Sequence, residues 1–242
     1  TLVGAWPIEA ERVSSFAEKA AREAKEYTAW SHIDADYEAC LQNFVKEILA
    51  DTSFLSDLET FVEPLLFPGR INALTQVLLK LTAPGVPDIY QGSELWDMSL
   101  VDPDNRRPVD FVRRRKLLAE LDGLSPEDIM ARMGEGLPKL WMIHRTLAFR
   151  NRFPDIFASP TYRPLFAAGR RADHVVSFMR QQDMVTIVPR LILNFNGQWE
   201  DTAITLPPGN WQNELTGDDV KGGKQQMRGL FDRLPVALLS RG

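Results

Sequence analysis

The chain has 242 residues, 44% of them hydrophobic and 25% charged, which is the composition of a globular protein with one large or two modest domains. Its formal net charge is -5, and no run of Lys or Arg is longer than the one at residues 113–116. This charge argues against nucleic acid or an anionic membrane as the main partner. No apolar run approaches the ~20 residues of a membrane span and no signal peptide is recognised, so we expect a soluble chain.

The single cysteine, Cys40, excludes an internal disulfide and a cysteine-rich metal site. It falls on an apolar position of a predicted helix, where a structural thiol is the expected role. A reducing, cytoplasmic location is the simplest interpretation. The three histidines stand apart, and no His, Asp and Glu residues have the spacing of metal ligands, so we expect neither a metal nor a cofactor.

Helical periodicity dominates the first half of the chain. Apolar residues recur at three- and four-residue spacing over residues 9–30, which predicts an amphipathic helix. Asp34 is a candidate N-cap for a second helix, whose stripe covers residues 37–49. A further helix is predicted over residues 54–65, where "FPGR" is expected to break it, and another over residues 71–81.

A short buried strand, "VPDIY", is predicted at residues 86–90 after a Pro-Gly turn. A helix, a tight loop and a strand in this order indicate part of an α/β architecture, in which binding groups gather where strands end. The loop at residues 93–110 has this position. Three more helices are predicted beyond it, at residues 111–121, 126–133 and 137–151.

The pattern changes near residue 158. Short apolar segments then alternate with turn residues at the spacing of a small antiparallel sheet or sandwich. We therefore expect two domains, at residues 1–157 and 158–242.

The polar loop "DPDNRRP", residues 102–108, has two interpretations. In the first, its aspartates make Asx turns and its arginines neutralise them. In the second, the loop binds a ligand, because Tyr90, Trp96 and the arginines are side chains that stack on sugars or hydrogen-bond to carboxylates. The residues themselves leave both interpretations open.

Two of these stretches resemble a known enzyme family. "GVPDIYQGSE" and "DPDNRRP" are similar to the eighth barrel strand and following loop of the α-amylase family of glycoside hydrolases and transglycosylases. A narrower resemblance covers nearly the whole chain and is to the C-terminal third of the maltooligosyltrehalose synthases. It rests on "TLVGAWP", "KAAREAKEYTAW", "LTAPGVPDIYQGSELWDMSLVDPDNRRPVDF" and "LTG" followed by "LPVALL".

The resemblance implies a fold and an activity. The fold would be α/β plus all-β: the helix-rich C-terminal portion of a (β/α)8 barrel followed by a small antiparallel β-sandwich. The activity of the intact enzyme would be that of a (1→4)-α-D-glucan 1-α-D-glucosylmutase. This intramolecular transglucosidase converts the reducing-end α-1,4 linkage of a maltooligosaccharide to α,α-1,1, by a retaining mechanism with two carboxyl groups.

The chain departs from the family in one respect. The family's nucleophile, acid/base and third carboxylate lie on earlier barrel strands, and the "HDTK"-like run that accompanies the third is not found in this sequence. We therefore expect no catalytic residue here, an inactive fragment, and the N-terminal barrel of the same polypeptide as its missing partner.

Residues at the end of the eighth strand and in its loop are the candidates for substrate-binding or supporting roles. They are Tyr90, Gln91, Glu94, Trp96, Asp102, Asn105 and Arg106. For Glu94 the alternatives are a sugar contact and an ion pair with Arg106 or Arg107, and for Asp102 and Asn105 hydrogen bonds that organise the loop. Two other functions stay open: an α-amylase-like hydrolase fragment, and a non-catalytic glucan-binding or structural module.

Overall fold

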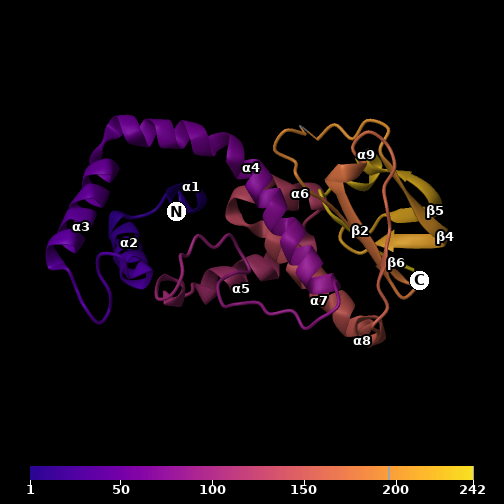
Figure 1. Ribbon diagram of the computed structural model, residues 1–242. Helices are drawn as coiled ribbons and strands as arrows, with labels where there is room; N and C mark the ends of the chain where they lie inside the picture. Colours follow the sequence, from indigo (N-terminus) through magenta and orange to yellow (C-terminus); the bar gives the residue numbers. More distant parts are fainter. Residues whose placement is uncertain (196, 242) are drawn as a thin grey trace. The chain divides into compact units, whose positions relative to one another are not determined.

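The computed structural model describes residues 1–195 and 197–241 and divides them into two compact units (Figure 1). Unit 1 comprises Thr1–Leu66 and Asp97–Pro108, and unit 2 comprises Phe67–Trp96 and the chain from Val109 onward. The expected division at residues 157 and 158 stays a prediction, and unit 2 contains residues from both sides of it. Residues 196 and 242 of the expected second domain lie outside the described residues.

Unit 1 consists mainly of α1 (Leu2–Ala5), α2 (Ala10–Ala24), α3 (Ala35–Ala50) and the first part of α4 (Thr52–Thr82). The predicted helix over residues 9–30 is wrong beyond residue 24, because Lys25 adopts the left-handed conformation with φ 59° and ends α2. The predicted cap is confirmed: the Asp34 side chain accepts a hydrogen bond from the backbone N–H of Tyr37 at 2.9 Å. The loop of residues 97–108, with a 3-10 turn at Asp104–Arg106, completes the unit.

Helix α4 contradicts the predicted break at "FPGR". The helix continues through Pro68 and Gly69 for 31 residues. A proline removes one backbone hydrogen bond from a helix. The apolar side chains that follow, Ile71, Leu74 and Leu78, are almost completely buried, and this burial offsets the lost bond.

The predicted strand at residues 86–90 is not formed either. Within the described residues this segment pairs with no other strand and is irregular. It is also not buried throughout, since Val86 is 98% exposed. A strand is stable only when its backbone groups hydrogen-bond to a neighbour, and a local apolar pattern cannot supply that neighbour.

The three helices predicted in unit 2 after the loop are confirmed. They are α5 (Phe111–Glu120), α6 (Pro126–Ala131) and α7 (Leu137–Arg152). A short helix that was not predicted, α8 (Pro154–Ala158), follows them, and 3-10 turns lie at Leu121–Gly123, Met133–Glu135 and Ala172–His174. Ser125 begins α6 with a capping box, in which its hydroxyl accepts from the N–H of Asp128 while the Asp128 carboxylate accepts from the N–H of Ser125.

Six antiparallel strands of unit 2 form one sheet, which confirms the antiparallel strands predicted for this region. The strands are β1 (Arg163–Pro164), β2 (Val175–Arg180), β3 (Met184–Pro189), β4 (Ala203–Asn213), β5 (Asp219–Gln226) and β6 (Ala237–Arg241), in the order β1-β2-β3-β6-β4-β5. The short helix α9 (Met227–Leu230) lies between β5 and β6 in the chain.

Both faces of the sheet are covered by apolar side chains at β3, whose six residues are all buried. Met184 and Val188 belong to the same core cluster as helix residues such as Leu78. Val185 and Ile187 point to the other face and belong to a second cluster. The first cluster joins helices and strands across residue 158, which explains why they form one compact unit.

The buried guanidinium of Arg180 connects distant segments of unit 2. Its side chain, 1% exposed, donates to the carbonyl oxygens of Thr82, Phe157, Ser159 and Thr161. Burial disfavours the charged form, so the pKa of Arg180 lies below its ordinary value. The carbonyl bonds compensate for this burial and tie the end of α4 to β2.

Two further findings bear on the sequence-based expectations. Cys40 is exposed, so the expected buried structural thiol is wrong. Among the helices of the described chain, none combines the length and apolarity that crossing a membrane requires.

Candidate functional site

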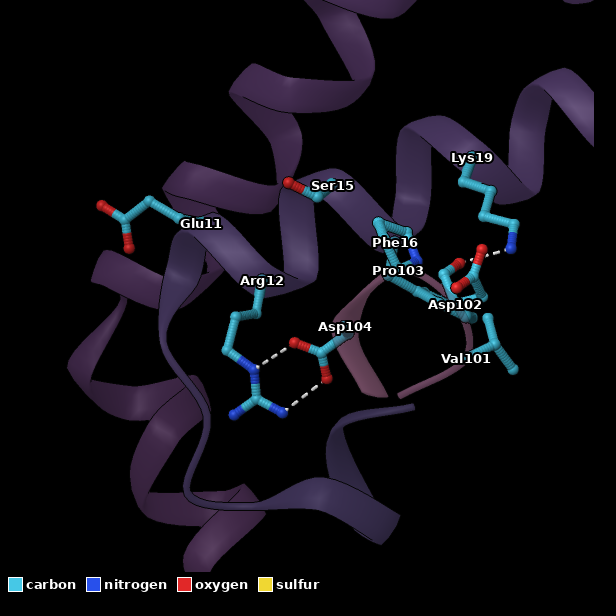
Figure 2. A pocket seen from close by; sticks show the side chains of 9 residues that line it. All are labelled: Glu11, Arg12, Ser15, Phe16, Lys19, Val101, Asp102, Pro103 and Asp104. Carbon is cyan, nitrogen blue, oxygen red and sulfur yellow. Dashed lines mark hydrogen bonds and ion pairs between the residues drawn. The ribbon is translucent and has the colours of Figure 1, made fainter. Parts of the chain in front are cut away.

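Helix α2 holds the polar loop of unit 1 in place (Figure 2). Arg12 donates from Nε and Nη2 to the two carboxylate oxygens of Asp104, each at 2.8 Å, and from Nη2 to the carbonyl oxygen of Met98 at 2.7 Å. The backbone N–H of Leu100 adds a bond to Asp104 Oδ2 at 2.6 Å. One bidentate ion pair therefore fixes the loop from Met98 to Asp104 against the first turn of the helix.

The electrostatics of this pair limit what it can do chemically. The hydrogen bond from Arg12 is the main reason that the pKa of Asp104 is lowered to about 2. The same hydrogen bond raises the pKa of Arg12 above its ordinary value. Because Asp104 is ionised at neutral pH and both its oxygens accept hydrogen bonds, it cannot serve as a proton donor. The pair is suited to positioning the loop.

A pocket of about 240 Å³ lies between α2 and the loop (Figure 2). Its lining combines charged, hydroxyl and apolar side chains: Glu11, Arg12, Ser15, Phe16, Lys19, Val101, Asp102, Pro103 and Asp104. Lys19 donates from Nζ to the carbonyl oxygen of Asp102 and closes one side. The surface that the pocket exposes is mainly apolar, and Arg12, Lys19 and Asp104 already hydrogen-bond within the chain.

The sequence-predicted residues of unit 1 are brought together in this loop. Asp102 lines the pocket, and its carboxylate forms an ion pair with Arg106, the two side chains being 47% and 70% exposed. Asn105 lies between them in the chain, and its side-chain oxygen is buried without a hydrogen-bond partner in the part of the chain that is described. A buried acceptor without a donor is costly, so this oxygen lowers the stability of the loop as described.

Sequence reasoning missed Arg12 and Lys19. For Asp104, one of the two interpretations of the loop gave an organising role, and its hydrogen bonds support that role, with Arg12 as a partner that was not expected. Arg12 and Asp104 are 92 residues apart. No local pattern links positions so far apart, although a basic residue on the first turn of α2 is visible in the sequence.

The other predicted residues belong to unit 2. Tyr90 and Gln91 are exposed at the end of the irregular segment. Glu94 pairs with Arg114, Oε2 to Nε at 2.9 Å, so its ion-pair partner is neither of the two arginines expected from the sequence. Arg114 also donates to the carbonyl oxygen of Gly92 at 2.5 Å, which attaches this turn to α5.

Trp96 is fixed inside unit 2. Its indole N–H donates to the carbonyl oxygen of Met133 at 2.5 Å. Its backbone approaches Gly136 so closely that a Cβ there would lie 3.0 Å from the Trp96 nitrogen. Gly136 has φ 84°, a conformation that glycine adopts without strain. In the described structure Trp96 is therefore held by a hydrogen bond and by close packing against Gly136.

No family model matches the chain. Individual known proteins do match it. A Mycobacterium tuberculosis protein provisionally named maltooligosyl trehalose synthase is 39% identical over 246 residues, which cover 98% of this chain and 30% of that protein. The solved structure of maltooligosyltrehalose synthase from Arthrobacter ramosus matches all of the chain at 38% identity with a TM-score of 0.88, using 31% of that enzyme.

The chain belongs to the maltooligosyltrehalose synthase family. A solved glycosyltrehalose synthase also matches 100% of the chain, at 26% identity and a TM-score of 0.80. The chain spans about 30% of the length of the curated synthases it matches. No group of His, Cys, Asp and Glu suited to a metal ion occurs among residues 1–195 and 197–241.

Proposed function

We propose that this chain is the C-terminal part of an intramolecular transglucosidase of trehalose biosynthesis. The intact enzyme would convert the reducing-end α-1,4 linkage of a maltooligosaccharide to α,α-1,1, as a cytoplasmic (1→4)-α-D-glucan 1-α-D-glucosylmutase. The observation that carries the proposal is the alignment of 98% of the chain with a synthase at 39% identity.

The finer architecture is part of the proposal. Helices up to residue 157 would be the C-terminal helices and eighth-strand segment of an incomplete (β/α)8 barrel, and the curled sheet would be the core of a C-terminal β-sandwich. The exposure of Val86 supports this assignment, because an apolar segment that becomes a central barrel strand needs neighbours on both sides. Residues 86–90 would pair when the N-terminal barrel is present.

The loop would form one wall of the active site. Asp102, Asn105 and Arg106 would face the substrate, with the Arg12–Asp104 pair holding the loop in shape. In unit 2, Tyr90 and Gln91 at the end of the eighth-strand segment would be substrate-binding residues, while Glu94 and Trp96 support that segment through Arg114 and Met133. A positioned wall of this kind excludes water and orients the released glucose, which a transfer to a sugar hydroxyl requires.

The catalytic carboxylates would come from the rest of the polypeptide. Retaining transfer needs a nucleophile and an acid/base about 5 Å apart. In the candidate site, Asp104 is held ionised by Arg12 and Asp102 is paired with Arg106. These arrangements suit binding and support, so the chain alone is expected to be inactive.

A chimera tests the proposal. The matching segment of the Arthrobacter ramosus synthase is replaced by this chain, and the chimera and the chain alone are incubated with maltopentaose. The chimera is expected to remove reducing ends without releasing shorter sugars, and the chain alone to leave the substrate unchanged. Conversion by the chain alone would refute the absence of catalytic groups. A rise in reducing ends would instead support the α-amylase-like hydrolase.

A further inference from the structure

The turn between α2 and α3 exposes aromatic rings away from the candidate site. Tyr27 is 67% exposed and Trp30 is 57% exposed. Tyr27 stacks on Tyr37 with ring centroids 5.1 Å apart and ring planes 22° apart. The guanidinium of Arg22 lies over the Trp30 ring, 4.8 Å from its centroid. Large aromatic side chains contribute most to stability when buried, so two such rings exposed on one short turn suggest a binding role.

Buried polar groups hold this turn rigidly. Arg22 donates to both oxygens of Glu38, at 2.8 and 2.7 Å, and the hydroxyl of Thr28 donates to the same carboxylate at 2.6 Å. Ala29 and His32 exchange backbone hydrogen bonds at 2.8 and 3.0 Å across the tip that carries Trp30. The rings are therefore positioned before any ligand arrives, which reduces the entropy lost on binding.

The composition of the turn suits the face of a sugar ring. A pyranose presents C–H groups that pack on an aromatic ring and hydroxyl groups that hydrogen-bond at its edge. Within residues 25–34, Ile33 is the only large aliphatic side chain, and exposed polar residues such as Lys25, Ser31 and His32 alternate with the rings. Since Arg22 covers one face of Trp30, the opposite face is the open one.

We propose that Tyr27 and Trp30, with Tyr37 stacked behind the Tyr27 ring, form a glucan-binding platform that holds an α-1,4-linked maltooligosaccharide. The choice of an α-glucan rests on the proposed function. The platform shares no residue with the pocket between α2 and the loop, so it is an additional site. Glucose units of one chain would stack on the open faces of Tyr27 and Trp30, with hydroxyls meeting the polar residues of the turn.

Titration of maltoheptaose into the ¹⁵N-labelled chain tests the platform. The reporter is the indole N–H resonance of Trp30, assigned by its loss in Trp30→Phe. The indole N–H groups of Trp96, Trp141 and Trp211 donate to backbone carbonyls and serve as internal references. The Trp30 resonance is expected to shift saturably while the references stay still. A Trp30 resonance that does not move at saturating sugar would overturn the proposal.

Variants separate the platform from other exposed rings. Trp30→Ala and Tyr27→Ala are each expected to weaken maltoheptaose binding roughly tenfold, the loss of about one ring–sugar stack. Phe44→Ala removes an equally exposed ring from α3 and is the matched control, with unchanged affinity. Circular dichroism checks that each variant is folded. Equal affinity of the platform and control variants would refute the proposal.

The same change in the chimera distinguishes a sugar site from a contact with the rest of the polypeptide. Trp30→Ala is expected to raise KM for maltoheptaose about tenfold with little change in kcat. A loss of folded chimera would overturn the platform and assign the rings to a protein contact. Binding is measured on the chain alone and conversion on the chimera, so failure of the platform and failure of the proposed function are distinguishable.

Discussion

Asp104→Asn tests the ion pair that shapes the loop of residues 97–108. Asparagine keeps the size of the side chain but replaces one carboxylate oxygen with an NH2 donor, so it cannot form the two parallel bonds to Nε and Nη2 of Arg12. The pKa of Asp104 is about 2 against an ordinary value of 3.8, which corresponds to about 2 kcal/mol of stability from the ionised carboxylate. Both side chains are only 14% exposed, so solvent screens the pair weakly.

The pH dependence follows from the direction of the shift. Because the pKa of Asp104 is lowered in the folded chain, its stabilisation is complete above the ordinary value of 3.8 and is lost as the pH falls towards 2. Asp104→Asn is therefore expected to lower the free energy of unfolding of unit 1 by about 2 kcal/mol at neutral pH, and by progressively less below pH 3.8.

Hydrogen exchange of the α2 amide groups is the appropriate assay, because it reports on unit 1 separately from unit 2. Asp102→Asn is the matched control. Its partner Arg106 is 70% exposed, and the expected loss is about 0.5 kcal/mol or less. The reasoning would be refuted if the difference in free energy of unfolding between Asp104→Asn and the unaltered chain stayed constant from neutral pH down to the pKa of Asp104. So would equal effects of the two substitutions.

Three further predictions concern unit 2 and are measured by urea unfolding. Arg180→Met is expected to lower the free energy of unfolding by about 3 kcal/mol or more, because four carbonyl oxygens lose their donor. A decrease of less than about 1 kcal/mol would contradict this role of Arg180. Gly136→Ala is expected to lower the free energy of unfolding by about 1–3 kcal/mol, because φ is 84° and the new Cβ would lie 3.0 Å from the Trp96 nitrogen. An unchanged free energy of unfolding would contradict this and show that the turn adapts. Trp96→Phe is expected to lower the free energy of unfolding by about 1–2 kcal/mol, because the Met133 carbonyl loses its donor. The affinity for maltoheptaose is expected to stay unchanged, and weaker binding would place Trp96 at the substrate.

Local signals in the sequence predicted local structure well. The Asp34 cap and the three helices after the loop depend on side chains within a few residues of one another, and the structure confirms them. The alternation of short apolar segments with turn residues likewise predicted antiparallel strands. These features are determined by interactions that any short stretch contains.

Features that depend on distant partners were predicted poorly. "FPGR" has the residues of a helix break, but burial of the side chains after it keeps α4 continuous. "VPDIY" has the composition of a strand, but within the described residues it has no neighbour to pair with.

The candidate site shows the same limit. The sequence indicated the loop, and the resemblance supplied its family. Neither could indicate that Arg12 holds Asp104 or that Glu94 pairs with Arg114, because those pairs form only when the chain folds. The roles of the seven predicted residues at the substrate stay predictions.

The most direct test of the proposed function is the anomeric proton spectrum of maltopentaose after incubation with the chimera of this chain and the Arthrobacter ramosus synthase. We predict that the reducing-end anomeric signals disappear and that the signal of an α,α-1,1 linkage replaces them, with no free glucose accumulating. A folded chimera that leaves the reducing-end signals unchanged, or that produces glucose and shorter maltooligosaccharides, would contradict the proposal.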